Sequence, residues 1–83
     1  NYFNYTISGR YVEFLFNVTE INFDGIEYID NSASRPIWRV LCSRLSDGIC
    51  KKRKLFSSGL HNLDIQITDE AGNAIGFPIS FVV

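Results

Sequence analysis

Apolar and polar residues alternate along the C-terminal arm of the chain, from Gly59 to Val83. The apolar positions are every second residue on both sides of a short break: Leu63, Ile65 and Ile67, then Ile75, Phe77, Ile79, Phe81 and Val83. A period of two predicts a pair of half-buried β-strands. The break, Asp69–Asn73, carries Asp and Gly where a three-residue hairpin loop needs them. This loop sets apolar residues opposite each other: Ile67 with Ile75, Ile65 with Phe77, and Leu63 with Ile79.

The N-terminal segment alternates in the same way. We expect strands over Tyr2–Ile7 and Arg10–Thr19, with a tight turn at Ser8-Gly9. The inward positions are Phe3, Tyr5 and Ile7 in the first strand and Val12, Phe14, Phe16 and Val18 in the second. Such a turn places inward residues opposite each other: Tyr5 with Val12, and Phe3 with Phe14.

Three further strands are expected in the middle of the chain, at 26–30, 37–44 and 49–56. Glu20–Gly25 and Asn31–Pro36 read as connections, and Ser46–Gly48 as a turn. Trp38, Val40 and Cys42 share one phase of their strand, so we expect Trp38 to pack in the core rather than to serve as an exposed sugar-stacking platform. Seven short strands at roughly ten-residue spacing predict an all-β antiparallel β-sandwich, a single domain over 1–83.

The composition agrees with a small globular domain. Of the 83 residues, 46% are hydrophobic and 20% charged, which excludes disorder. No apolar run approaches the roughly 18 residues of a membrane-spanning helix, and no signal peptide is recognisable. The sequence contains no Met, so we expect a mature, processed or excised piece of a longer protein.

The net charge of −1 argues against nucleic-acid binding, but the charges are unevenly spread. Seven of the eight basic residues lie in the interval 35–54: Arg35, Arg39, Arg44, Lys51, Lys52, Arg53 and Lys54. The run Lys51–Lys54 puts two cations on each face of its strand, which is incompatible with a central core strand. It predicts a lysine-protected edge strand, or a contact with an anionic partner such as an acidic polysaccharide.

The two cysteines, Cys42 and Cys50, face each other across the Ser46–Gly48 turn in the expected register. A disulfide between them closes a short loop and is worth roughly 2–3 kcal/mol. A metal site needs about four ligands, but His61 is the only other soft ligand and there is no CxxC spacing. Two free thiols are the remaining alternative. A disulfide implies an oxidising, extracytoplasmic compartment.

Two N-glycosylation motifs are present, at Asn4-Tyr5-Thr6 and Asn17-Val18-Thr19. Both asparagines fall on the outward phase of neighbouring strands, so the two sites would present glycans on one face. The alternative is two ordinary solvent-facing asparagines.

The sequence offers little support for a calcium site or for catalysis. Asp69, Glu70 and Asn73 lie in one loop, but they lack the dense Asp-x-Asp spacing of strong calcium loops, and turn chemistry accounts for Asp69. The single histidine, His61, has no nucleophile beside it, and no phosphate-binding loop or carboxylate pair is recognisable. We therefore expect no cofactor, no metal and no enzyme activity.

The run from Gly59 to Asn73 resembles the last strands of prokaryotic immunoglobulin-like repeats of cell-surface and secreted proteins. Those repeats carry a Gly, an aromatic residue or His, alternating aliphatic residues and then Asp-x-Ala-Gly-Asn. The resemblance covers about 24–83, and His61 takes the place of the tyrosine of a tyrosine corner. It implies an immunoglobulin-like fold and structural or adhesive roles without catalysis. The cystine-bearing basic hairpin departs from the typical repeat.

These observations predict an extracellular structural or adhesive domain of a larger surface layer, filament or adhesin. Its partners would be neighbouring copies or domains of the same surface protein, joined by strand addition at a chain end. Two alternatives are a module that binds anionic glycans through the basic hairpin and a calcium-stiffened surface repeat.

Overall fold

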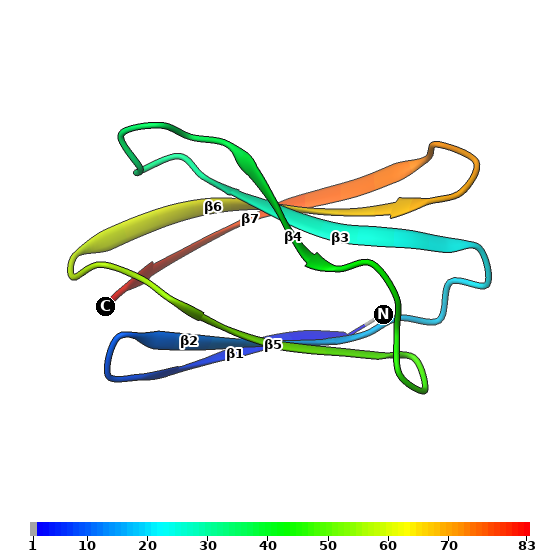
Figure 1. The fold of residues 1–83 in the computed structure, drawn as a ribbon, viewed down its shortest axis with the longest axis horizontal. Coiled ribbons are helices and arrows are strands. Elements are labelled where there is room, and N and C mark those ends of the chain that lie inside the picture. Colours follow the sequence, from blue (N-terminus) through cyan, green and yellow to red (C-terminus); the bar gives the residue numbers. More distant parts are fainter. Residues whose placement is uncertain (1) are drawn as a thin grey trace.

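A computed structural model describes residues 2–83, which form two antiparallel sheets packed face to face (Figure 1). The strands are β1 (Tyr2–Ser8), β2 (Tyr11–Asn17), β3 (Phe23–Asp30), β4 (Trp38–Cys42), β5 (Ile49–Leu55), β6 (Leu60–Asp69) and β7 (Ala74–Val82). One sheet has the order β1-β2-β5 and the other β4-β3-β6-β7. The protein is thus an all-β sandwich, as the sequence predicted.

The strand order is of the immunoglobulin-like type. In that fold the second strand pairs with the fifth, and the third with the sixth, so that each sheet combines early and late strands. Here β2 pairs with β5 and β3 with β6. The fourth strand lies beside β3 rather than beside β5, which gives sheets of three and four strands.

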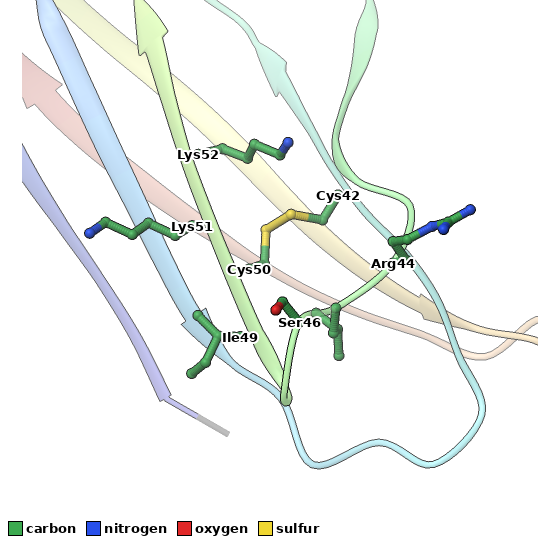
Figure 2. A pocket seen from close by; sticks show the side chains of 8 residues that line it. Cys42, Arg44, Ser46, Ile49, Cys50, Lys51 and Lys52 are labelled. Atoms are coloured by element: carbon green, nitrogen blue, oxygen red, sulfur yellow. A yellow bond between two sulfur atoms is a disulfide. The ribbon is translucent and has the colours of Figure 1, made fainter.

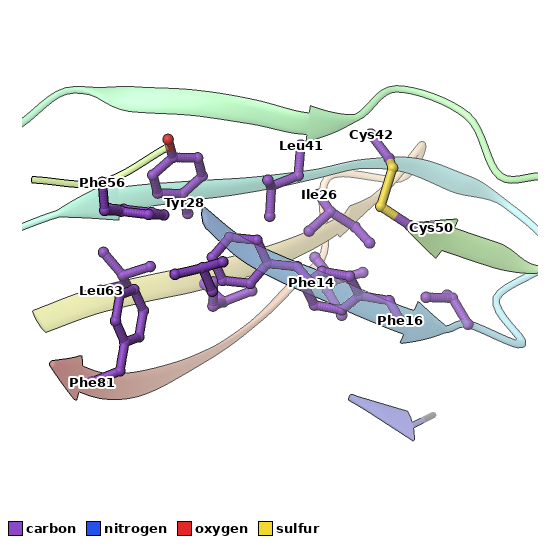
Figure 3. Packing of buried hydrophobic residues seen from close by; sticks show 14 residues of the cluster. Phe14, Phe16, Ile26, Tyr28, Leu41, Cys42, Cys50, Phe56, Leu63 and Phe81 are labelled. Atoms are coloured by element: carbon purple, nitrogen blue, oxygen red, sulfur yellow. A yellow bond between two sulfur atoms is a disulfide. The ribbon is translucent and has the colours of Figure 1, made fainter. Parts of the chain in front are cut away.

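The core lies between the sheets and consists of the inward residues of each strand (Figure 3). Val12, Phe14 and Phe16 of β2 are completely inaccessible to solvent, which confirms the inward phase predicted for that strand. Five rings pack against one another at one end of the core: Phe14, Tyr28, His61 and Phe81 from the two sheets, and Phe56 just after β5. Aromatic residues dominate because each fills much of the space between the sheets.

The β6–β7 hairpin has the predicted register, with Ile67 opposite Ile75 and Leu63 opposite Ile79. Its loop closes with a hydrogen bond from the Asp69 amide to the Asn73 carbonyl, and Gly72 adopts a positive φ of 86°. The side chain of Asp69 accepts hydrogen bonds from the amides of Ala71 and Asn73. The loop chemistry read from the sequence therefore fixes this register.

The predicted register of the first hairpin is wrong by two residues. Tyr5 lies opposite Phe14 and Ile7 opposite Val12, because the two-residue loop is Gly9-Arg10 rather than Ser8-Gly9. Gly9 takes the positive φ (62°) at the first loop position, as in a type II′ turn. A shift of two residues leaves the inward phase unchanged. Ile7, however, is 42% exposed near the end of the sheet.

The prediction that Trp38 packs in the core is also wrong. A β-bulge between β3 and β4 pairs Ile26 with Cys42 but Glu27 with Val40, so Leu41 is an extra residue on β4. The bulge reverses the phase of the strand before it. Leu41 and Cys42 are both buried, whereas Trp38 is 47% and Val40 is 56% exposed. Trp38 and Val40 therefore lie on the outer face of the four-stranded sheet.

Candidate functional site: a basic cleft between two sheet edges

The disulfide between Cys42 and Cys50 is confirmed, but it joins the two sheets rather than two paired strands. Cys42 ends β4 in one sheet, Cys50 lies in β5 of the other, and their Cα atoms are 6.1 Å apart. Between the two cysteines, hairpin-like pairing is limited to the turn, where Ser46 and Ile49 form an isolated antiparallel β-bridge. The bond therefore links the two edge strands on one side of the sandwich.

Beside the disulfide lies a cavity of about 580 Å³. Arg44, Lys51 and Lys52 line it together with the cystine and Ser46. In Figure 2, Lys52 points to the side on which Cys42 and Arg44 lie, and Lys51 points to the opposite side of β5. The cavity is consequently positive on both its β4 and β5 sides.

The edge position predicted for Lys51–Lys54 is confirmed, because among the strands of residues 2–83 β5 pairs only with β2. Lys52 and Lys54 lie opposite Phe14 and Val12, on the inward phase of the strand. They avoid the core because β5 is an edge, where long side chains can leave the space between the sheets for solvent. Lys52 is exposed and Lys54 is half-buried.

The other two cations of the run belong to the outer face of the three-stranded sheet. The Arg53 guanidinium lies over the ring of Tyr11, 4.6 Å from its centroid, and Lys51 Nζ is 3.9 Å from a carboxylate oxygen of Glu13. Both contacts are exposed, and such contacts contribute at most about 1 kcal/mol. The run is thus divided into an outer pair, Lys51 and Arg53, and an inner pair, Lys52 and Lys54.

A second cavity, of about 350 Å³, lies farther along β5 and is lined by Lys54 and by Arg39 of β4. Arg39 lies opposite the inward residue Tyr28, so it is the counterpart on β4 of the inner pair on β5. We use the name basic cleft for the two cavities together, with their cations Arg39, Arg44, Lys52 and Lys54. Arg39 and Arg44 were not among the predicted contact residues, although the concentration of positive charge in 35–54 pointed to this region.

His61 borders the second cavity and is buried (7% exposed). Its Nδ1 is 2.6 Å from Oδ2 of Asp30, and its Nε2 is 2.7 Å from the carbonyl oxygen of Ser57. A carboxylate and a carbonyl are both acceptors, so this geometry favours the imidazolium, in which each ring nitrogen donates a proton. Burial lowers the pKa of His61, but the hydrogen bonds to Ser57 and Asp30 and the Asp30 charge raise it above its usual value. Its contact with an upstream backbone carbonyl is the contact of a tyrosine corner.

The two glycosylation motifs lie on one face, as the strand phases predicted. Asn4 is opposite Leu15 and Asn17 is opposite Tyr2, so both belong to the outer face of the three-stranded sheet, where both are exposed. The carboxamide oxygen of Asn4 accepts a hydrogen bond from the amide of Tyr5 at 2.9 Å. Attachment of glycans at Asn4 and Asn17 stays a prediction.

The Asp69 loop shows the turn chemistry that was the alternative to a calcium site. Hydrogen bonds from the backbone and side chain of Asn73, and from the amides of Ala71 and Gly72, hold the pKa of Asp69 below its usual value. In the described part of the chain, no group of three or more His, Cys, Asp or Glu residues is placed to hold a metal ion.

Within residues 2–83, no helix is long and apolar enough to cross a membrane. In comparisons with protein-family models, with curated proteins and with solved structures, the chain gives no match.

Proposed function

We propose that this domain is an extracellular adhesive module of a larger cell-surface assembly, and that its basic cleft binds an acidic polysaccharide. The observation that carries the proposal is that cations from both sheets line two cavities on the same side of the sandwich: Arg39 and Arg44 from the β4 side, Lys52 and Lys54 from β5. A long polyanion laid along β5 would meet these charges in succession. Clefts lined by one sign of charge concentrate ligands of the opposite sign.

Two further features support the extracellular part of the proposal. The domain contains a disulfide, and disulfides persist mainly in oxidising compartments. It also exposes two glycosylation motifs on one face of the three-stranded sheet. The resemblance to surface repeats and the structural role of an immunoglobulin-like module belong to the same proposal.

The positions of the cations provide a matched experiment. Lys52→Gln/Lys54→Gln removes two charges from the cleft, whereas the outer control, Arg35→Gln/Arg53→Gln, removes two charges that line neither cavity. We expect the parent to bind immobilised polygalacturonate or heparin, and the inner double variant to elute at a clearly lower salt concentration than the outer one. Isothermal titration with short oligomers of the same acids would give the affinities.

Equal elution of the two double variants would contradict a role for the cleft, because it would show a response to net charge alone. Retention of the inner variant at the salt concentration of the parent would contradict the whole anionic-ligand proposal. Circular dichroism of each variant checks that the fold is preserved.

Assembly by strand addition is the second candidate, and the sheet edges bear on it directly. The Gly59–Val83 hydrogen-bonded pair implies that Asp64 and Pro78 form a non-hydrogen-bonded pair, so the Pro78 nitrogen faces the free edge of β7. There it removes a donor that an added strand would need. The Ser80 carbonyl accepts a hydrogen bond from the Tyr5 hydroxyl at 3.3 Å.

The other edges carry comparable obstacles: the Asn4–Tyr5 hydrogen bond on β1, the bulge on β4 and the cations on β5. Adhesion through the cleft is therefore better supported than strand addition. If β7 were a docking edge blocked by proline, Pro78→Val would increase self-association in sedimentation velocity. A Pro78→Val variant that stays monomeric at high concentration would argue against β7 as an assembly edge.

A further inference from the structure

The outer face of the four-stranded sheet carries a groove that has no part in the basic cleft. It has a volume of about 350 Å³ and runs from Trp38 on β4 to Gly76 and Pro78 on β7. The register places Trp38, Ile29, Asp64 and Pro78 in one row across the sheet. The row crosses four strands, so the distance between its two ends, Trp38 and Pro78, is three inter-strand spacings, or about 14 Å.

The shape of the groove follows from two residues, Gly76 and Trp38. Gly76 has no side chain and leaves a gap in the next row, in which it lies opposite Gln66. Trp38 of β4 lines the groove together with residues of β6 and β7, so its indole reaches from the edge strand toward the middle of the sheet. Because 47% of its surface is exposed, the indole offers an apolar surface to solvent. An exposed tryptophan at a groove commonly marks a binding surface.

Polar groups converge on the same groove. Asp64 and Gln66 of β6 line it, and they project from the middle of the sheet. The Asp64 carboxylate is oriented by a 2.9 Å hydrogen bond from the side-chain amide of Asn31. The carboxylate only accepts hydrogen bonds, whereas the carboxamide of Gln66 both donates and accepts them.

We propose that this groove binds a neutral saccharide. A pyranose ring has one apolar C–H face, which suits an indole, and a rim of hydroxyl groups, which suits a carboxylate beside a carboxamide. The charges on the face, from Asp64 and from Glu27 opposite Gln66, are negative, and they disfavour uronate and sulfate groups. The volume of the groove lies near the lower end of the range for small-molecule sites, which begins at about 300 Å³.

The only tryptophan in the chain is Trp38, so intrinsic fluorescence reports on the groove directly. We would titrate the protein with neutral hexamers of glucose, mannose and N-acetylglucosamine. The expected result is a saturable blue shift of the emission with at least one of them, because the sugar excludes water from the indole. Amide chemical-shift changes should map to β4, β6 and β7.

Two variants test the assignment. Gly76→Thr fills the gap without removing a binding group, and Gly76 has no positive φ that would oppose the side chain. The nearest atom to a new Cβ is the Ile65 carbonyl oxygen at 3.4 Å. Trp38→Ala removes the indole and is followed by chemical shifts. Both should weaken binding at least about tenfold, which is about 1.4 kcal/mol. Leu60→Ala is the matched control, since Leu60 is exposed on the same sheet outside the groove.

Three outcomes would overturn the proposal. One is the absence of any response to all three hexamers at millimolar concentration. Another is a response to tetramethylammonium but not to sugars, which would identify a cation site made by the indole and carboxylates. The third is a dimer that Trp38→Ala converts to a monomer, which would identify a self-association surface. The Lys52→Gln/Lys54→Gln variant should bind the hexamer normally, so this test is independent of the basic cleft.

Discussion

The sandwich has two lateral sides, where an edge strand of one sheet lies beside an edge strand of the other. The two sides are held together in different ways. On one side, aromatic rings of β1 and β7 pack against each other. The ring centroids of Phe3 and Phe77 are 5.2 Å apart, and those of Tyr5 and Phe81 are 5.6 Å apart. On the other side β4 and β5 are joined by the disulfide, and cavities lined by cations lie beside it. A packed side leaves no space for a ligand.

The difference shows why the cystine matters for the proposed function. Cations that face each other across an opening repel and would drive the two edges apart. A covalent bond holds the edges at a fixed separation without filling the space between them with apolar side chains. The disulfide therefore lets one side of a small domain remain both charged and concave.

The largest effect should come from the packed side. Phe81→Ala removes a buried ring that contacts Tyr5, Phe14 and Phe56, and it should lower the free energy of unfolding by about 3–5 kcal/mol. Urea unfolding measures this loss. Under conditions in which the variant is still folded, its affinity for the acidic polysaccharide should equal that of the parent. A parallel loss of affinity would contradict the separation of the two sides.

Removal of the disulfide should have a smaller effect on stability and a larger one on binding. Cys42→Ala/Cys50→Ala opens a loop with a sequence separation of 8, which should cost about 2–3 kcal/mol. Because the covalent bond between β4 and β5 is lost, we also expect weaker polygalacturonate binding by the folded fraction. Unchanged binding would show that the cleft does not depend on the covalent bond.

His61 lies where the two sides meet, since it packs on Phe81 and borders the cavity of Arg39 and Lys54. Its pKa in the folded state is raised above the usual 6.5. The stability that His61 contributes should therefore be complete below about pH 6.5 and should disappear as pH rises through the raised value. Asp30 is its charge partner, and Tyr28 and the two cations line the same cavity.

Urea unfolding between pH 5 and pH 9 tests this expectation. The sequence has one histidine, so His61→Gln should remove most of the pH dependence over this range. A parent whose stability rises from pH 6 to pH 8 would have the opposite sign and would contradict the charged imidazolium. Binding of polygalacturonate by the variant, measured at pH 7, shows whether the ring also affects the cleft.

The smallest effect is expected for Tyr5→Phe. The hydroxyl donates one long hydrogen bond to the Ser80 carbonyl at the exposed edge of β7, so its loss should cost about 0.5–1 kcal/mol. The ring contact with Phe81 is retained. Thermal unfolding monitored by circular dichroism measures the change, and a loss as large as that of Phe81→Ala would show that the hydroxyl, rather than the rings, closes this side.

Strand phase and loop chemistry could be read from the sequence because both are local. The alternation of Val12, Phe14 and Phe16 with polar residues predicts a strand with one buried face, whatever its neighbours are. The Asp69 and Gly72 positions fix the β6–β7 register by hydrogen bonds within five residues. The Cys42–Cys50 disulfide was predicted correctly, although the expected pairing of their two strands was wrong, and the charge run correctly predicted that Lys51–Lys54 lies on an edge strand.

Only the tertiary structure decided which strands are neighbours, and the candidate sites depend on that. Trp38 reaches the surface because one extra residue, Leu41, changes the alignment of β4 with β3, and periodicity does not reveal such a bulge. Arg39 and Lys54 face one cavity because β4 and β5 are edges of different sheets on the same side. Burial patterns follow from a strand's own residues, whereas edges, bulges and the spaces between sheets follow from long-range pairing.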